Sequence, residues 1–384
     1  MHTPLVVPLV ASYSIPFRRG VSFLLRWVIV ALLLGLCLEQ RALAQSSRCS
    51  ESADGLLRVA FPRFSLQASA FAQLQYLFFF RADEVSRSDF SIPRARVCGS
   101  GYVIAHSLRY RLMIGRSSQR ELEINDAFLE WEPLPAFAVR LGRLKLPIIH
   151  EWIESAQPLA TVDRALSSRL LLPGRDYGLR VSGRLLAQHL DYLIGVFNGD
   201  GESATRATDL SPAVVARLAL HLTGNPYIGA VDFEGSPPHV SLEAGTLWNR
   251  WKPAASSGAS PAQPAPVEDT LWNVSALLRW HHFDGAAEYI GLRRTDSQKT
   301  LRTHAGYLRL TYFVTRLHSA VSARASLVSV RGGQPDDQLE TEGSWGVFLD
   351  RHRIKVISRY ALLQNLTQHT KEHQLGLLTQ VAVD

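Results

Sequence analysis

Arginine is the residue type in this sequence that is best placed to do chemistry. Lys and Arg together number 41, and since five of these are Lys, 36 are Arg; the formal net charge is +7. A guanidinium group is planar, permanently charged and able to bind phosphate or carboxylate through two parallel hydrogen bonds. Such a chain suits an anionic partner, which could be nucleic acid, an acidic membrane face or a small anion.

The positions of the Arg residues decide among these partners. The segments 108–114 (LRYRLMI), 307–314 (YLRLTYFV) and 321–327 (VSARASL) place apolar residues at alternate positions, with Arg between them. This period of two predicts strands with one apolar and one polar face. Because the Arg residues are spread over the whole chain in this way, we predict no nucleic-acid partner.

The alternating segments together predict a closed barrel. Their apolar faces run for about 9–11 residues, the length that crosses a bilayer at a tilt. A soluble sandwich would mix Lys, Glu, Thr and Ser on its wet face. We therefore predict an all-β fold, a 16-stranded antiparallel transmembrane β-barrel with lipid outside and water inside. The predicted strands are 62–76, 90–104, 106–115, 122–133, 136–146, 176–186, 189–197, 212–222, 239–249, 271–282, 285–294, 302–314, 316–330, 341–349, 352–363 and 373–383.

Tryptophans near the predicted strand ends suit the aromatic girdles of such a barrel. Core aromatics of a soluble protein are the alternative. The residues in question are Trp152, Trp248, Trp251, Trp272, Trp280 and Trp345.

The first segment of the chain reads as a signal peptide. Arg18, Arg19 and Arg26 precede an apolar run at 27–38, and Ala42-Leu43-Ala44 offers a cleavage site. An uncleaved anchor is the alternative, but the run is shorter than the ~20 residues that a spanning helix needs. We expect residues 1–44 to be the signal peptide, 45–60 an N-terminal periplasmic segment and 61–384 the barrel. Cys49 and Cys98 would then enter an oxidising compartment, where they could pair or stay as thiols.

Four common enzyme motifs are absent from the sequence. The sequence holds no G-x-S-x-G, no H-E-x-x-H, no P-loop and no G-x-G-x-x-G after a strand. His281 and His282 would point to opposite faces of a strand, which disfavours a metal site. We predict no enzyme, no catalytic residue, no metal and no cofactor.

More specific motifs lie in residues 136–200. In order they read RLGRLKLP, HEW, VDRAL, PGRDYG and GVFNGDG. This block resembles the phosphate-selective porin family, the porin O and P group of Gram-negative outer membranes, and the resemblance extends over roughly residues 60–384. It implies a 16-stranded barrel in the outer membrane, in contact with its lipid, assembled as a homotrimer around an anion-conducting pore. It also implies that the loop 147–175 folds inward as a constriction; this loop contains Arg164, Arg169 and Arg175 but no Lys.

Two sets of residues follow as candidate sites. The candidate pore-lining anion sites are Arg109, Arg111, Arg180, Arg184, Arg217, Arg279, Arg309, Arg324, Arg353, Lys355 and Arg359. Their alternative role is pairing with the inward acids Asp126, Glu130, Glu243 and Glu288, which would only stiffen the wall. The candidate constriction-loop residues are Glu151, Glu154, Asp163, Arg164, Arg169, Arg175 and Asp176. These would either set the charge at the narrowest point or pin the loop to the wall.

The function predicted is an outer-membrane porin that passes small anions, phosphate or polyphosphate, by passive diffusion through an Arg-lined pore. A barrel of the same fold for another solute, such as a sugar, would be expected to line its inner face with aromatics. Few aromatics, Tyr307 and Phe128 among them, fall at inward positions. A non-conducting structural barrel with a charge-plugged lumen and a secreted soluble β-protein remain the alternatives.

Overall fold

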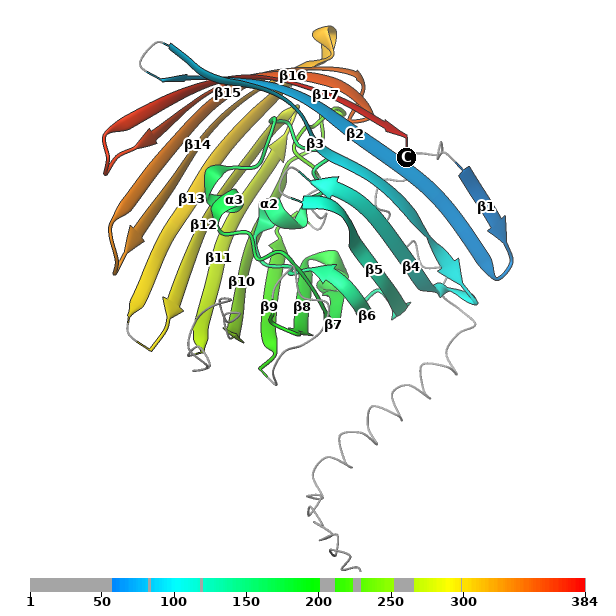
Figure 1. Ribbon diagram of the computed structural model, residues 1–384. Coiled ribbons are helices and arrows are strands. Elements are labelled where there is room, and N and C mark those ends of the chain that lie inside the picture. The colour runs from blue at the N-terminus through cyan, green and yellow to red at the C-terminus, as the bar shows by residue number, and fades with distance from the viewer. Residues whose placement is uncertain are drawn as a thin grey trace, which may run out of the picture. The chain divides into compact units, whose positions relative to one another are not determined.

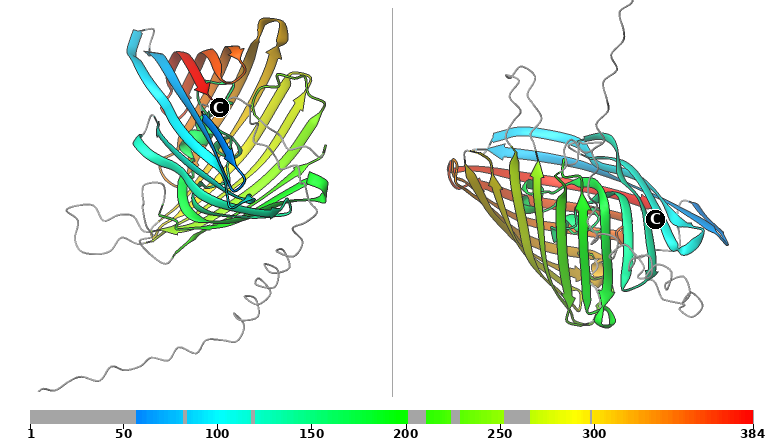
Figure 2. Two further views of the ribbon diagram at one scale, coloured as in Figure 1. Left: turned by 90° about the vertical axis from the view of Figure 1, so that its right-hand side faces the viewer. Right: turned by 90° about the horizontal axis from the view of Figure 1, so that it is seen from below.

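Sixteen strands, β2 to β17, form a closed antiparallel barrel, whose arrangement can be followed in Figures 1 and 2. The computed structural model describes residues 57–81, 84–117, 120–200, 211–223, 229–251, 266–297 and 299–383. Each strand pairs with the next along the chain, and β17 pairs with β2, which closes the ring. A closed ring has no unpaired edge, so every strand satisfies its backbone groups within the sheet.

The strands correspond one to one with those predicted from the alternating pattern. They are β2 (Phe64–Arg81), β3 (Glu84–Val103), β4 (Ala105–Ser117), β5 (Arg120–Leu134), β6 (Phe137–Lys145), β7 (Arg175–Leu185), β8 (Leu190–Phe197), β9 (Ala213–His221), β10 (His239–Trp251), β11 (Val267–Trp280), β12 (Phe283–Thr295), β13 (Thr300–Val314), β14 (Ser319–Arg331), β15 (Asp336–Asp350), β16 (Ile354–Asn365) and β17 (Thr370–Val383).

Burial alternates along the strands as the sequence predicts. On β13, Leu308 and Tyr312 are 52% and 51% exposed, whereas Arg309 between them is fully buried. The exposed side chains point outward and the buried ones point into the barrel. The apolar outer face and the charged interior therefore arise from one alternating pattern.

The two ends of the barrel differ in their connections. At one end of the barrel, here called the turn end, two or three residues join β11 to β12 and β15 to β16, and β17 ends there. The helical turns η1 (Leu186–Gln188) and η2 (Thr315–Leu317) also lie at this end. The opposite loop end carries the links 146–174, 198–212 and 252–266. In outer-membrane barrels the short turns are periplasmic and the longer loops extracellular. The predicted long link at 331–340 is wrong, because β15 already begins at Asp336.

A short strand precedes the barrel. β1 (Leu57–Phe61) forms a tight hairpin with the start of β2, from Phe61 opposite Phe64 to Leu57 opposite Ala68. The end of the predicted periplasmic segment 45–60 is thus part of the sheet. Residues 1–56, which include the predicted signal peptide and Cys49, lie outside the described residues, while Cys98 is a buried residue of β3.

None of the helices in the described part of the chain has the length and apolar character needed to span a membrane.

Candidate functional site: the charged lumen

The link 146–174 folds against the inner wall of the barrel. It contains the short helices α2 (His150–Ile153) and α3 (Leu166–Leu170), which lie inside the ring of strands in Figure 1. The backbone N–H of Ser167 donates to Ser326 Oγ on β14 at 3.0 Å, and the N–H of His150 donates to Glu288 Oε1 on β12 at 2.8 Å. The wall therefore supplies hydrogen-bond acceptors for backbone N–H groups of the link. The helices α2 and α3 are too short to provide partners for these N–H groups within the link itself.

Lys355 fixes the middle of the same link. Its ammonium group, fully buried on β16, donates to the carbonyl oxygens of Gln157 at 2.6 Å and Leu159 at 2.7 Å. Lys355, a predicted pore-lining anion site, thus binds the backbone of the loop.

Lys145 and Trp152 organise the first turn of the link. Lys145 Nζ donates to the carbonyl oxygens of Trp152, Ile153 and Glu154, at 2.8 to 3.2 Å, where α2 ends. The Trp152 indole lies 5.2 Å from the charged groups of Lys145, Arg164 and Arg175. Trp152 is only 5% exposed, so its predicted place in an interfacial girdle is wrong. Trp251 likewise faces the interior, where its Nε1 donates to Asp269 at 3.1 Å.

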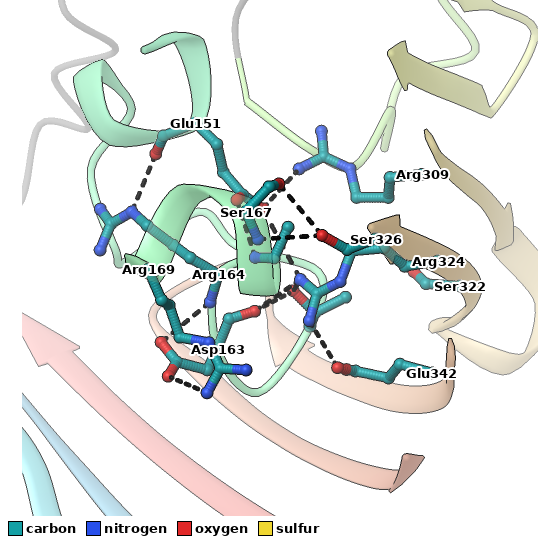
Figure 3. Close-up of polar contacts among 12 residues, drawn as sticks. Glu151, Asp163, Arg164, Ser167, Arg169, Arg309, Ser322, Arg324, Ser326 and Glu342 are labelled. Carbon is teal, nitrogen blue, oxygen red and sulfur yellow. Dashed lines mark hydrogen bonds and ion pairs between the residues drawn. The ribbon is translucent and has the colours of Figure 1, made fainter. Parts of the chain in front are cut away.

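Glu151 joins the two halves of the link to the β13–β14 wall (Figure 3). It is fully buried, and its Oε2 accepts the Ala165 N–H at 2.8 Å. Its Oε1 lies 3.6 Å from Arg324 and 3.9 Å from Arg309. Arg324 also reaches Glu342 at 2.6 Å. A buried carboxylate held by two guanidinium groups and a backbone N–H fixes the loop to the barrel wall. Of the two roles that the sequence left open for Glu151, this contact fits attachment of the loop rather than control of the charge at the narrowest point.

His150 forms a second buried anchor. Its Nδ1 lies 2.9 Å from Glu243 on β10, and its Nε2 lies 3.6 Å from Glu154. Burial opposes a charge on this ring, but the two carboxylates outweigh burial, so the pKa of His150 lies well above its ordinary value.

Asp163 is the acid at the turn before α3. It pairs with Arg94 at 2.5 Å and with Arg169 at 3.8 Å. Although burial favours the neutral acid, these two guanidinium groups hold the pKa of Asp163 well below its usual range. Arg169 continues to Glu340 on the wall at 2.5 Å, while Arg164 donates to the carbonyl oxygens of Glu151 and Glu154.

Arg175 and Asp176 do not belong to the loop. Both lie at the start of β7, because the strand begins one residue earlier than predicted. Arg175 pairs with Asp126 at 3.0 Å, and Asp176 accepts the N–H of Tyr177 and of Gly199, which ties β7 to the link after β8. Arg353 is also misplaced in the prediction: it lies in the turn before β16 and pairs with Asp350 at 3.5 Å.

The predicted pore-lining Arg residues all have acidic partners. The pairs, with their closest distances, are Arg109 with Glu130 (3.6 Å) and Glu132, Arg111 with Asp126 (3.8 Å), Arg180 with Glu130 (3.5 Å), Arg184 with Asp191 (3.7 Å), Arg217 with Glu243 (2.7 Å), Arg279 with Asp284 (3.0 Å), Arg309 with Asp284 (3.3 Å), Arg324 with Glu342 (2.6 Å), Arg353 with Asp350 (3.5 Å) and Arg359 with Glu342 (3.7 Å). On β10 to β15 the buried carboxylates outnumber the buried arginines; the carboxylates are Glu243, Asp269, Asp284, Glu288, Glu340 and Glu342, and the arginines are Arg309 and Arg324.

A different part of the lumen carries an excess of positive charge. The basic cluster consists of Arg94, Arg96, Arg111, Lys145, Arg164 and Arg175, from β3, β4, β6, β7 and the link. Its carboxylates are Asp126 and Asp163, with Glu151 acting on Arg164 from the other side. In the contacts described, six cations face these three carboxylates, so positive charge is in excess in this part of the lumen.

Arg96 lies at the centre of this excess. It is 8% exposed, and among the described residues no carboxylate forms an ion pair with it. The charged groups that act on it most strongly are Arg175, Arg94 and Arg164, followed by the carboxylate of Asp126. Gly115 on β4 makes room for it, since a Cβ there would lie 2.5 Å from Arg96 Cγ. Sequence reasoning missed Arg94, Arg96 and Lys145; the alternation of 94–98 (RARVC), with Arg at 94 and 96, was the available signal.

A second segment enters the lumen from the turn end. Residues 229–236, between β9 and β10, pack Phe233 against Phe313 and Phe348, with ring centroids 5.0 and 5.4 Å away. Asp232 accepts the N–H groups of His282 and Ser236, both at 2.8 Å. Gly229 and Gly235 bound the segment with φ of 75° and 67°, values that favour glycine.

The two inward segments meet. Ala160 of the link belongs to the same apolar cluster as Ala230, Val231 and Phe313. A Cβ on Gly229 would lie 3.8 Å from Pro158 Cβ. The passage through the barrel is therefore bounded by segments from both ends, one of which the sequence did not indicate.

The family of the chain follows from a match over most of its length. The profile of the family "phosphate-selective porin O and P" matches residues 66–330. The chain belongs to this family, as the motifs in 136–200 suggested. Its members are porins, which indicates a porin rather than an enzyme.

Solved structures share the fold at low sequence identity. An anion-selective porin from Comamonas acidovorans has a TM-score of 0.58 at 10% identity, over 83% of this chain and 99% of that one. OmpF of Salmonella typhi in complex with daunomycin has 0.58 at 13%, over 84% and 100%. The trimer form of OmpT from Vibrio cholerae has 0.56 at 11%, over 83% and 99%. A search of curated proteins finds no match for this chain.

Proposed function

We propose that this porin passes small anions, with phosphate and polyphosphate as candidate solutes, by passive diffusion, and that the anions travel along the basic cluster. The observation that carries the proposal is Arg96, an inward cation whose strongest charged neighbours are other arginines and which forms no ion pair with a carboxylate in the described part of the chain. A water-filled path walled by protein focuses such an excess of charge and raises the local anion concentration.

The Arg residues that already pair with carboxylates argue against a series of equivalent anion sites along the whole lumen. Arg217 at 2.7 Å from Glu243 and Arg324 at 2.6 Å from Glu342 already have their counter-charges. An anion would have to displace a carboxylate to bind there, at the expense of a buried pair. Selectivity on this proposal comes from the side of β3 to β7, where the basic cluster lies.

A second candidate is a barrel that does not conduct. It is favoured by the contact between the two inward segments, where Ala160 packs with Ala230 and Val231. The two candidates differ in one property that can be measured directly, which is whether the purified protein forms channels.

The test is the reversal potential of the refolded protein in a planar bilayer under a KCl gradient. We expect anion selectivity in the native chain and a clear shift toward cations in Arg96→Gln. The matched control is Arg184→Gln, an inward arginine of β7 that lies 3.7 Å from Asp191; it should shift the potential less. Equal shifts in the two variants would contradict the basic-cluster path, and a native chain without channels would favour the closed barrel.

Phosphate is tested in the same recordings. Millimolar phosphate that reduces the chloride current in the native chain, and less so in Arg96→Gln, supports phosphate as a solute. Chloride current that is indifferent to phosphate keeps the anion channel and removes the phosphate assignment.

We also propose that the protein is a homotrimer located in the outer membrane, after signal-peptide-directed export. The support is the fold shared with barrels that the comparisons describe as outer-membrane proteins, one of them in a trimer form. Cross-linking of the protein in outer-membrane fractions tests both points at once; a monomer band alone would refute the trimer.

A further inference from the structure

The outer face of the barrel carries three arginines in one cross-strand row near the loop end. Arg293 on β12 lies directly opposite Arg302 on β13, and Arg302 lies directly opposite Arg331 on β14. All three side chains are exposed. Side chains directly opposite each other on neighbouring strands have Cβ atoms about 4.5–5.5 Å apart, and like charges in such positions repel. Arg302 has a like charge on both sides.

The three arginines differ in whether a carboxylate forms an ion pair with them. Arg331 has Asp337 at 2.6 Å. Within the described parts of the chain, neither Arg293 nor Arg302 forms an ion pair with a carboxylate. Two opposed, exposed guanidinium groups that repel each other form a site that an external anion would stabilise, and their geometry is suited to an oxyanion with several oxygens.

The rows below the arginines show where this site lies relative to the bilayer. The next outward row holds Trp272, Gly291 and His304, and the row after it holds Tyr289. The Trp272 and Tyr289 rings are 5.1 Å apart, and the Tyr289 hydroxyl is 2.6 Å from His304 Nδ1. Tyr and Trp on the outer face of a barrel mark the boundary between hydrocarbon and headgroups.

The height of the apolar belt agrees with that placement. On β13 the outward residues run from His304 through Leu308 and Leu310 to Tyr312. The eight steps from His304 to Tyr312, at about 3.4 Å each, span about 27 Å along the strand, or roughly 20 Å across the membrane at a tilt of about 40°, near the ~25 Å band of such barrels. Arg302, two residues beyond His304, therefore lies at headgroup level on the side of the long loops.

We propose that Arg293 and Arg302, with Arg331 beside them, bind a phosphate group of a phosphorylated lipid of the outer leaflet. The proposal rests on the outer-membrane location proposed above, but not on conduction, because these side chains point away from the lumen. The lipid's acyl chains would lie on the apolar rows beneath, against Leu308, Leu327 and their neighbours. Trp272 and Tyr289 would contact the sugar or glycerol part at the boundary.

The test measures lipid affinity of the refolded full chain in detergent. The probes are lipid A with both phosphates, its dephosphorylated form, and inorganic phosphate. We expect the double variant R293Q/R302Q to bind the phosphorylated lipid at least tenfold more weakly than the native chain. The matched control is Arg250→Gln, an exposed outward arginine of β10 whose cross-strand neighbour is Glu268; it should retain native affinity.

Four results would overturn the proposal. Three of them are unchanged affinity in the double variant, an equal loss in Arg250→Gln, and equal binding of the dephosphorylated lipid. Competition by inorganic phosphate at the same concentration as the lipid would refute the lipid as occupant. The reversal potential of the double variant separates the two proposals: it should stay native, so a loss of lipid binding with native selectivity supports the lipid site whether or not the anion path proves correct.

Discussion

Replacing Lys355 with Met should release the middle of the link from the barrel wall. The buried ammonium group donates to the carbonyl oxygens of Gln157 and Leu159 at 2.6 and 2.7 Å. Met keeps a straight apolar stem of similar length but can donate to neither oxygen. The two carbonyl groups would then lose their charged partner, although Gln380 still donates to the Gln157 oxygen at 3.2 Å.

The magnitude follows from these two bonds. Hydrogen bonds to a charged group contribute about 1.5–3 kcal/mol each, so their loss costs about 3–6 kcal/mol. Part of this is returned, because the native state must desolvate the ammonium group, a penalty of several kcal/mol that Met does not incur. We expect a net loss of about 1–3 kcal/mol, which shifts the balance between the bound and released link about 5- to 150-fold.

Single-channel recording measures that shift. The variant should show more frequent current fluctuations than the native chain, because the link leaves the wall for a larger fraction of the time. Lys371→Met, on the exposed start of β17, is the control with the same chemical change. Conductance and current noise identical to the native chain, in a variant that folds to a closed barrel as judged by heat-modifiable gel mobility, would refute the anchoring role of Lys355.

Two further predictions concern the anchors of the lumen. The pKa of His150 is raised in the folded state, so its ion pairs contribute stability that is present in full below the ordinary pKa of 6.5 and is lost as the pH rises through the higher folded value. The denaturant concentration at the unfolding midpoint should therefore decrease as the pH rises above neutrality. A His150→Gln variant with the same pH dependence would contradict this. Phe233→Ala removes a ring packed on Phe313 and Phe348, so we expect a loss of about 3 kcal/mol, the lower part of the range for buried rings, and faster protease cleavage in 229–236; Leu349→Ala, which exchanges an exposed outward side chain, should have little effect on either.

The strands could be predicted from the sequence because each carries its own evidence. In a barrel of this kind every strand meets lipid on one face and the lumen on the other, so the alternation in 307–314 identifies β13 without reference to any other segment. The closure of β17 on β2 also follows, since an open edge is excluded in a bilayer.

The partners of the charged residues could not be predicted in the same way. Arg217 meets Glu243 only because β9 and β10 pair in a register that places Ala219 opposite Glu243 and Arg217 opposite Gly245. A shift of one residue would turn one of the two side chains to the lipid face. The inward segment 229–236 was missed for a related reason: Phe233 is a single aromatic residue in a stretch without period, and its partners Phe313 and Phe348 are far away in the sequence.

The short strand β1 has a consequence for how the ring is closed during assembly. β17 runs along one edge of β2 until Val383 lies opposite Ala70, and β1 occupies the same edge from Ala68 onward. The β1–β2 hairpin needs only local contacts, whereas the β17–β2 seam joins residues more than 300 positions apart and so is expected to form late. When β17 arrives, β1 is already in place and blocks its path. The hairpin therefore stops β17 from sliding toward the start of β2. A slide of one residue in that direction would exchange the lipid-facing and lumen-facing side chains of β17, so the hairpin excludes that closure of the barrel.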